Sequence, residues 1–268
     1  MKENKPVPSE LYTGEYFLTN CTGYKEFMET KGKKLIPRLK DVLNLAQIRP
    51  GMKIIDLGCG RGELILHALH SGATVTGIDY STNAIKLAKE AISLSPDEEK
   101  KRITLINGDV KDINYSDNTF DIVFMTDLVE HLYPEELQQV FCKTYNMLRK
   151  GGKLIIHTAP NIWYTDYAYK FIRQVVLFKE FVLGTKNVLP KIHHSMIGIN
   201  EIVHVNLQNP RSLRKNLKKS SFNKTKIVFN EEGPMYGKNI LNRVINSIFQ
   251  LYPLKLFFNL CIYAVAEK

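Results

Sequence analysis

Short apolar runs alternate with stretches of helical periodicity between residues 50 and 160. The runs are rich in β-branched residues and predict strands at Lys53–Leu57, Thr74–Asp79, Arg102–Asn107, Phe120–Thr126 and Lys153–Thr158. The helices predicted between them are Gly62–His70, Asn83–Leu94 and Pro134–Leu148. Strands that alternate with helices are typical of βαβ crossovers, so we expect a parallel sheet with helices on both faces.

The pattern changes on both sides of this region. Residues 25–48 carry apolar positions at helical spacing, with breaks near Gly32 and Pro37. The elements predicted after Pro160 are helices at 163–183, 210–220 and about 238–250 and strands at Lys226–Phe229 and Leu260–Ala266. The fold class expected is α/β, with a doubly wound, seven-stranded, mostly parallel sheet. An N-terminal helical cover and an insertion after the fifth strand would complete it.

Charge is distributed unevenly along the 268 residues. The chain has 37 Lys and Arg against 27 Asp and Glu, a net charge of +10. Residues 161–268 hold 16 basic and 6 acidic residues, whereas residues 51–160 hold 12 and 15. The densest basic run begins at Arg211, where Arg214, Lys215 and Lys218 share a helical face with it. Such a run favours an anionic small molecule, RNA or an anionic membrane surface as partner.

The cysteines and the apolar segments exclude several classes of protein. The four cysteines are scattered without a paired motif, which argues against a disulfide scaffold or a zinc ribbon and favours a reducing compartment. The N-terminal residues lack the apolar segment of a signal peptide. The apolar stretch Ser247–Ala266 contains Pro253 and Lys255, which makes it a poor membrane span. We therefore expect a cytoplasmic protein.

A glycine-rich turn, Asp56-Leu57-Gly58-Cys59-Gly60-Arg61-Gly62, follows the first predicted strand and opens a helix. Such a turn is expected to present bare backbone N–H groups and a helix N-terminus to a ligand. The spacing of its glycines differs from the G-x-G-x-x-G of dinucleotide binders. The Asp56 carboxylate would repel a pyrophosphate but would hold a cationic amine, so the turn favours a ligand with an ammonium group.

Two further motifs follow the next predicted strands. Asp79 ends the second strand, where a carboxylate suits hydrogen bonds to ribose hydroxyls. Gly108-Asp109-Val110 follows the third strand, where a polar and an apolar side chain suit the edge and face of an adenine. Together with the glycine turn, these motifs predict a nucleoside ligand that carries an amine.

These motifs resemble, in order and spacing, those of class I S-adenosylmethionine (SAM)-dependent methyltransferases, over about residues 50–160. The resemblance implies SAM as cofactor. The residues implied for its pocket are Asp56, Gly58, Cys59, Gly60, Gly62, Asp79, Tyr80, Asp109, Val110, Asp127 and Leu128. It also implies three parts: residues 1–50 as a helical cover of the SAM site, 51–160 as the SAM-binding core, and 161–268 as an acceptor-binding lid with the final strands.

A second motif, Asp127-x-x-Glu130-His131, follows the fourth strand. On a helical turn its three side chains share one face, as a general-base cluster or as ligands of a divalent metal. It resembles the acid-x-x-Glu-His element of ubiquinone-pathway O-methyltransferases and of small-RNA 2′-O-methyltransferases. The small-RNA enzymes add a distant histidine as a fourth ligand, and the counterpart of that histidine here is His204. The implied catalytic residues are His131 and His204, and the implied metal ligands are Asp127, Glu130, His131 and His204.

Three functions follow from these motifs. The favoured one is SAM-dependent methyl transfer, with O-methylation preferred, to an anionic small-molecule, glycan or lipid-linked acceptor, with the protein as a monomer or homodimer. The second is an RNA 2′-O-methyltransferase that uses the metal site. The basic run favours this interpretation, because it could contact RNA phosphates. The third is a SAM-binding protein without catalysis. The amphipathic helix predicted over residues 163–183 also leaves peripheral contact with a membrane surface open.

Overall fold

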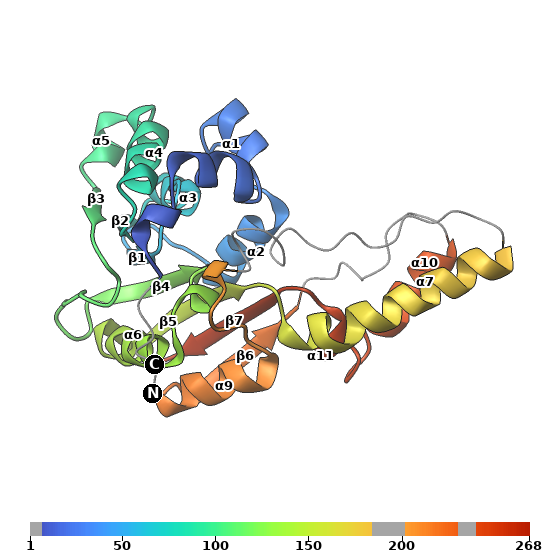
Figure 1. Ribbon diagram of the computed structural model, residues 1–268. Helices are drawn as coiled ribbons and strands as arrows, with labels where there is room; N and C mark the ends of the chain where they lie inside the picture. The colour runs from blue at the N-terminus through green and yellow to red at the C-terminus, as the bar shows by residue number, and fades with distance from the viewer. Residues whose placement is uncertain (1–6, 184–201, 230–239) are drawn as a thin grey trace.

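The computed structural model describes residues 7–183, 202–229 and 240–268. Its centre is a seven-stranded sheet in the order β3-β2-β1-β4-β5-β7-β6 (Figure 1). The strands are β1 (Lys53–Leu57), β2 (Thr74–Asp79), β3 (Ile103–Asn107), β4 (Phe120–Thr126), β5 (Leu148–Thr158), β6 (Lys224–Val228) and β7 (Ile262–Glu267). The pairs from β3 to β5 are parallel, and β7 is antiparallel to both β5 and β6. The expected doubly wound, mostly parallel sheet is confirmed.

Helices cover both faces of the sheet. One face carries α2 (Pro37–Ala46), α3 (Glu63–His70) and α4 (Thr82–Ser93), and the other carries α6 (Pro134–Met147) and α9 (Pro210–Lys219). Neighbouring residues on β1 supply opposite layers, because side chains alternate along a strand: Ile54 packs with the first group and Ile55 with the second. A short α5 (Asp97–Lys100), which the periodicity does not predict, lies between α4 and β3.

Residues 7–50 fold over the carboxyl ends of the central strands. They form η1 (Ser9–Leu11), η2 (Tyr16–Asn20) and α1 (Tyr24–Thr30) before α2. Tyr12, Phe17 and Phe27 pack against α4 and against Val203, which comes from the far end of the chain. The Ser81 hydroxyl, at the start of α4, donates a hydrogen bond to the Tyr12 carbonyl at 2.8 Å. This segment is called the N-terminal cover below.

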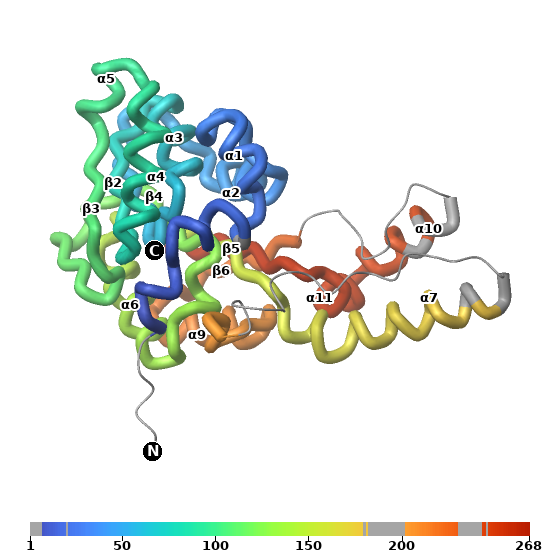
Figure 2. Tube along the Cα trace, turned by 45° about the horizontal axis from the view of Figure 1, so that its top comes forward, coloured from blue at the N-terminus to red at the C-terminus, as the bar shows by residue number. Residues whose placement is uncertain are grey.

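A pair of helices projects from the sheet edge as an arm (Figures 1 and 2). It consists of η4 (Tyr164–Ala168), α7 (Tyr169–Leu183), α10 (Ile240–Phe249) and α11 (Lys255–Phe258). Ring contacts join α7, α10 and α11: Phe171 lies 6.4 Å from Phe249 between ring centroids, and Phe249 stacks on Phe258 at 3.9 Å. Among the described residues, no helix is both long and apolar enough to cross a membrane.

Candidate cofactor and acceptor site

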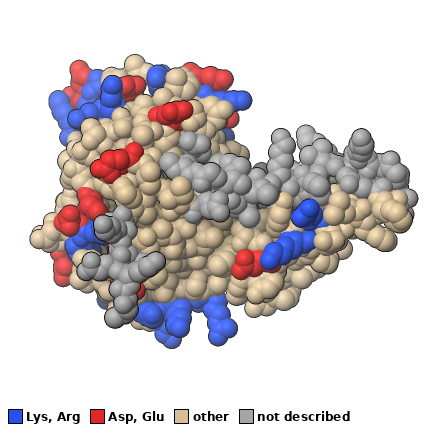
Figure 3. All heavy atoms as spheres, viewed as in Figure 1, with Lys and Arg blue, Asp and Glu red and all other residues tan. Residues whose placement is uncertain are grey.

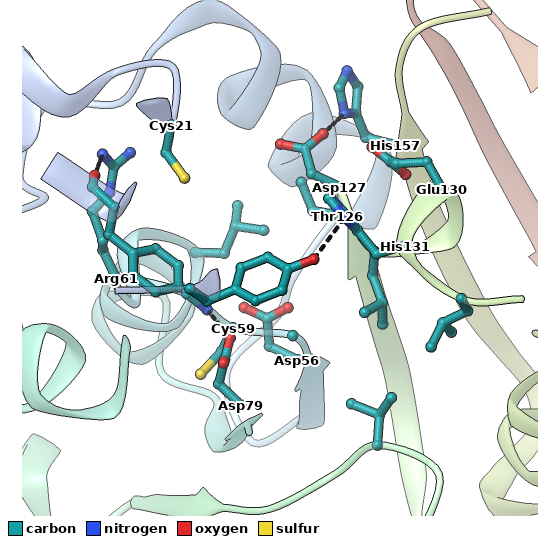
Figure 4. A pocket seen from close by; sticks show the side chains of 18 of the residues that line it. Cys21, Asp56, Cys59, Arg61, Asp79, Thr126, Asp127, Glu130, His131 and His157 are labelled. Carbon is teal, nitrogen blue, oxygen red and sulfur yellow. Dashed lines mark hydrogen bonds and ion pairs between the residues drawn. The ribbon is translucent and has the colours of Figure 1, made fainter. Parts of the chain in front are cut away.

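One cavity of about 260 Å³ lies at the carboxyl ends of β1, β2 and β4, under the N-terminal cover. Doubly wound sheets bind ligands at this edge. Ten of the eleven residues expected to contact SAM line the cavity, and Gly62 does not. Figure 4 shows Asp56, Cys59 and Asp79 grouped on one side of it, and Asp127, Glu130, His131 and His157 on the other. The two groups are described in turn below.

The backbone N–H groups of the glycine turn are already occupied. Those of Gly58 and Cys59 donate to the Ile78 carbonyl at 2.8 and 2.9 Å, and that of Gly62 donates to the Cys59 carbonyl at 3.0 Å. The Gly60 N–H donates to Asp79 Oδ2 at 2.9 Å. The expectation of bare N–H groups at this turn is therefore wrong. Because these donors are satisfied by the protein itself, the turn is not a phosphate cradle.

Gly62 serves packing instead of ligand contact. A Cβ added there would lie 2.9 Å from the Cβ of Ala88 on α4, and the residue has a φ of +82°. Both facts require glycine, since an L side chain is strained at this φ and α3 approaches α4 closely at this point. The expected contact of Gly62 with the cofactor is replaced by a contact between two helices.

Replacing Gly62 with Ala should therefore destabilise the fold. We expect a loss of about 2–4 kcal/mol in the free energy of unfolding, from left-handed strain plus overlap with Ala88. Urea unfolding measures it. Gly51→Ala is the matched control, because Gly51 has the same φ with nothing within 4 Å of an added Cβ, and we expect it to cost about 1–2 kcal/mol. Equal losses for the two variants would contradict the packing role.

Asp56 is a buried carboxylate whose partner is missing from the described residues. Its side chain is 2% exposed and its Oδ1 has no hydrogen-bond partner there. Burial, together with the nearby Asp79 and Glu63 charges, raises the pKa of Asp56 to about 8. A buried acceptor without a donor is unfavourable, and an ammonium group that enters the cavity would supply both the donor and the opposite charge.

Asp79 is held in place by the backbone. Its Oδ2 accepts from Gly60 N and its Oδ1 accepts from Ser81 N, each at 2.9 Å. Burial raises the pKa of Asp79 to about 6, and these two N–H groups oppose that shift. Each oxygen keeps a second lone pair, so the fixed carboxylate can still accept hydrogen bonds from a diol such as ribose.

The third strand contributes one polar and one apolar wall. Asp109 lies on the cavity beside the buried Val110, as expected for an adenine edge and face. Lys111 orients this carboxylate: its backbone N–H donates to Asp109 Oδ1 at 2.8 Å and its Nζ lies 3.4 Å from Oδ2. The same Nζ pairs with Glu136 Oε1 at 2.7 Å, so it is balanced by two acids. Tyr80 and Leu128 complete this side of the cavity.

Asp127 is turned away from Glu130 and His131. It has a left-handed φ of +53°, and the helical turn begins only at η3 (Val129–His131), so the expected shared face of a helix is wrong. Its carboxylate bonds to Arg38 from α2 and to His157 from β5. Burial would raise the pKa of Asp127, but these two cations outweigh it and hold that pKa below its ordinary value.

His157 is the buried partner of this carboxylate. Burial alone would lower the pKa of His157, but the Asp127 charge raises it to about 10. Arg38, Asp127 and His157 therefore form a charged network that joins the N-terminal cover to the sheet. All three residues line the cavity.

Glu130, His131 and His204 form the second cluster of titratable groups. One ligand atom from each lies within 4.8 Å of the others. Burial and the nearby Asp127 charge raise the pKa of Glu130 to about 7, while burial and His204 lower the pKa of His131 to about 3. At neutral pH His131 is therefore an uncharged imidazole, which keeps one nitrogen lone pair.

A metal fits this cluster poorly. Of the four expected ligands, Asp127 is engaged elsewhere, so the expected four-ligand set does not assemble. Glu130 Oε2 accepts from Thr158 Oγ1 at 2.7 Å. Ligand atoms about 2.1 Å from one ion lie roughly 3–4 Å apart, which is closer than the spread of the remaining three. The expected four-ligand metal site is therefore not assembled, and Glu130, His131 and His204 remain as a looser group of three.

The N-terminal cover orients His131 and holds the glycine turn. Tyr12 Oη lies 2.8 Å from His131 Nδ1, and the Val203 carbonyl lies 3.2 Å from the same nitrogen. We assign the proton to Nδ1, because the Val203 carbonyl can only accept; the Tyr12 hydroxyl then accepts from the same N–H, and Nε2 keeps the lone pair. The buried Arg61 donates to the Phe17 and Thr22 carbonyls at 2.8 and 3.0 Å and thereby ties the cover to the turn.

Sequence reasoning missed several of these residues. Arg38, Arg61 and Tyr12 act through contacts between segments far apart in the chain, which no local pattern encodes. His157 gave only the signal of an apolar strand. The aromatic residues near the N-terminus were the one available signal for the cover.

Comparison with known proteins places this site in a family. Residues 55–156 match the family described as a methyltransferase domain. The chain is 32% identical over 145 residues to the mitochondrial ubiquinone biosynthesis O-methyltransferase of Rattus norvegicus, which covers 54% of this chain and 39% of the relative. It is 33% identical over 132 residues to phosphoethanolamine N-methyltransferase 3 of Arabidopsis thaliana, which covers 48% and 25%. The matched part is about half the length of the first curated relatives, or less.

The fold agrees with solved structures of the same kind. Phosphoethanolamine N-methyltransferase 2 of Haemonchus contortus, in complex with phosphomonomethylethanolamine and S-adenosylhomocysteine, superposes with a TM-score of 0.58 and 18% identity. That match covers 96% of this chain and 60% of the other. Residues 55–156 are therefore a methyltransferase domain, and the chain has the fold of the class I S-adenosylmethionine-dependent methyltransferases.

Proposed function

We propose that the protein transfers the methyl group of SAM to a small-molecule acceptor, with oxygen as the favoured atom. The observation that carries this proposal is the buried Asp56 carboxylate, which has an oxygen without a partner among the described residues and faces the cavity beside the fixed Asp79. SAM offers an ammonium group to the first carboxylate and a ribose diol to the second. Asp109 and Val110 then take the adenine.

The acceptor belongs at the opposite end of the cavity, near His131, His204 and Ala159. Methyl transfer from a sulfonium is a direct displacement, for which alignment supplies much of the acceleration. When the acceptor is a hydroxyl, the Nε2 lone pair of His131 takes the proton as the carbon–oxygen bond forms. The Arg38–Asp127–His157 network and the Tyr12 hydroxyl hold the walls around this point.

Relatives support a small acceptor without identifying it. The names of two of them specify ubiquinone biosynthesis and phosphoethanolamine, one by O- and one by N-methylation. The N-terminal cover lies across the cavity, so a long polymer would have to displace it; this weighs against the RNA 2′-O-methyltransferase interpretation, as does the poor fit of a metal. A protein without catalysis would have no need of a neutral histidine at the acceptor end.

The test has two steps on the purified full-length chain. Calorimetric titration with SAM should give a single site, and radiolabelled SAM should then transfer its label to an RNA-free small-molecule extract of the source cells. Label found only in RNA would overturn the small-acceptor proposal. SAM binding without transfer to any fraction would favour the non-catalytic interpretation, and failure to bind SAM would overturn both.

A further inference from the structure

The arm carries large apolar side chains that the described residues leave exposed. On α7, Phe171, Phe178 and Phe181 are 52%, 69% and 87% exposed, and their spacing places them on one face of the helix. The opposite face is covered, because Ile172 and Val176 are buried against Phe258 and its neighbours. The α7 helix is therefore apolar on two sides. Among the described residues, Ile172 and Val176 are buried, whereas Phe178 and Phe181 stay exposed and Phe171, at the edge of the exposed side, touches Phe249 and Phe258.

The second helix of the arm, α10, exposes apolar side chains as well. Val244 and Ile248 stand four residues apart on α10 and are 52% and 48% exposed. The turn that follows exposes Leu251 and Tyr252. Scattered single apolar residues are normal on a protein surface, but a cluster on a projecting element marks an interaction site. These residues, with the three α7 phenylalanines, are called the arm patch.

Positive charge accompanies the arm patch. Residues 240–258 contain Arg243 and Lys255 and no acidic residue. On the body, α9 exposes five cations, which are Arg211, Arg214, Lys215, Lys218 and Lys219. In Figure 3 basic side chains gather along the lower edge of the body, where α9 lies in Figure 1, and the visible face of the arm carries a few charged side chains among uncharged ones. The cations of α9 and the exposed apolar residues of the arm thus belong to neighbouring parts of the molecule.

We propose that the arm patch inserts into the interfacial region of an anionic lipid bilayer, with the α9 cations against the lipid headgroups. Aromatic side chains on an amphipathic helix with neighbouring cations are the composition of interfacial membrane helices. Anionic lipid matches the charge of the α9 cations, which a second copy of the same basic chain does not.

This location has a consequence for the acceptor, and that consequence rests on the proposed function. The arm begins at η4, a few residues after Ala159 on the acceptor side of the cavity. A bilayer that held the arm would therefore lie close to the acceptor end of the cavity. The acceptor class that this arrangement serves is a lipid or lipid-linked molecule with a polar head.

Vesicle flotation tests the docking without any methyl transfer. The full-length chain is mixed with phosphatidylcholine vesicles, with and without phosphatidylglycerol. We expect it to float with the anionic vesicles and to be released by high salt. The double variant F178S/F181S should lose at least about tenfold in vesicle affinity, because two exposed phenylalanines no longer enter the lipid. Leu94→Ser, at an apolar residue 61% exposed beyond α4, should float like the wild type.

Two further measurements make the test decisive. Equal thermal unfolding midpoints for all three proteins show that the substitutions act at the surface. Light scattering reports the oligomeric state, and a dimer that F178S/F181S converts to a monomer would overturn the proposal by giving the arm patch another occupant. RNA binding without vesicle binding would overturn it too, as would equal flotation of F178S/F181S and the wild type. Failure of methyl transfer leaves the flotation result unaffected.

Discussion

The variant Asp56→Asn should bind SAM roughly 10- to 100-fold more weakly than the wild type while its free form stays folded. The wild-type side chain is 2% exposed and has an oxygen without a partner among the described residues, so Asn, which is neutral and of nearly the same shape, replaces a group whose ionisation is unfavourable in the free protein. In the complex the same change removes the countercharge of the ammonium group. Isothermal titration measures the first effect, and thermal unfolding of the free protein measures the second.

The pKa of Asp56 adds a pH dependence to this prediction. With a pKa raised to about 8 by burial, the carboxyl is mostly protonated in the free protein at neutral pH. SAM requires the ionised form, so its affinity should rise as the pH increases through neutrality toward 8, and Asp56→Asn should not show this rise. For stability the sign is opposite: a raised pKa in the folded state disfavours folding as the pH rises toward it, so the variant gains stability relative to the wild type over that interval.

An exposed acid provides the control. Asp112→Asn changes the net charge by the same amount outside the cavity, and we expect no change in SAM affinity beyond about twofold. If Asp56→Asn bound SAM as tightly as Asp112→Asn, the ammonium group would be held elsewhere and the central assignment would be wrong.

His131→Ala should lower kcat by about 100-fold or more, with SAM affinity within about threefold of the wild type. The reason is the loss of the Nε2 lone pair at the acceptor end, while Asp56 and Asp79 remain in place. Single-turnover transfer from radiolabelled SAM measures the chemical step. His70→Ala is the control, because His70 lies on α3 away from the cavity and pairs with Glu99.

The pH profile separates His131 from its neighbour Glu130. The pKa of His131 is lowered to about 3, so this base is available throughout the neutral range and gives a flat profile. Glu130, with a pKa raised to about 7, would instead give a rate that increases through neutral pH. An increase that Glu130→Gln abolishes, together with normal activity in His131→Ala, would transfer the base role to Glu130.

Most of the fold could be predicted from periodicity alone. The five central strands and the helices between them are encoded locally, because a buried parallel strand needs a continuous apolar run and its crossover helix needs one apolar face. The prediction was less accurate for the strand at the edge of the sheet. β6 begins at Lys224, two residues before the predicted strand, because its limits are decided by its pairing with β7 and not by its polar sequence. The helix predicted at about 238–250 corresponds to α10, of which the structure describes the residues from Ile240 onward.

The site shows where local reasoning ends. Asp56 and Asp79 were located by their place after buried strands, which is a property of the nearby sequence. Asp127 was placed on a shared helical face, but Arg38 from α2 and His157 from β5 draw its carboxylate aside. The N–H groups of Gly58 and Gly60 were expected to be free, and Ile78 and Asp79 occupy them. Each error concerns a partner distant in sequence.

Arg61 couples two events that a methyltransferase must perform in every cycle. The same guanidinium that steadies the glycine turn also holds the carbonyls of Phe17 and Thr22 in the cover. We expect cofactor exchange to require an opening of the cover, which would break these hydrogen bonds and withdraw Tyr12 from His131. Departure of the spent cofactor and disassembly of the acceptor end are thus one motion, which makes by-product release the expected bottleneck of turnover.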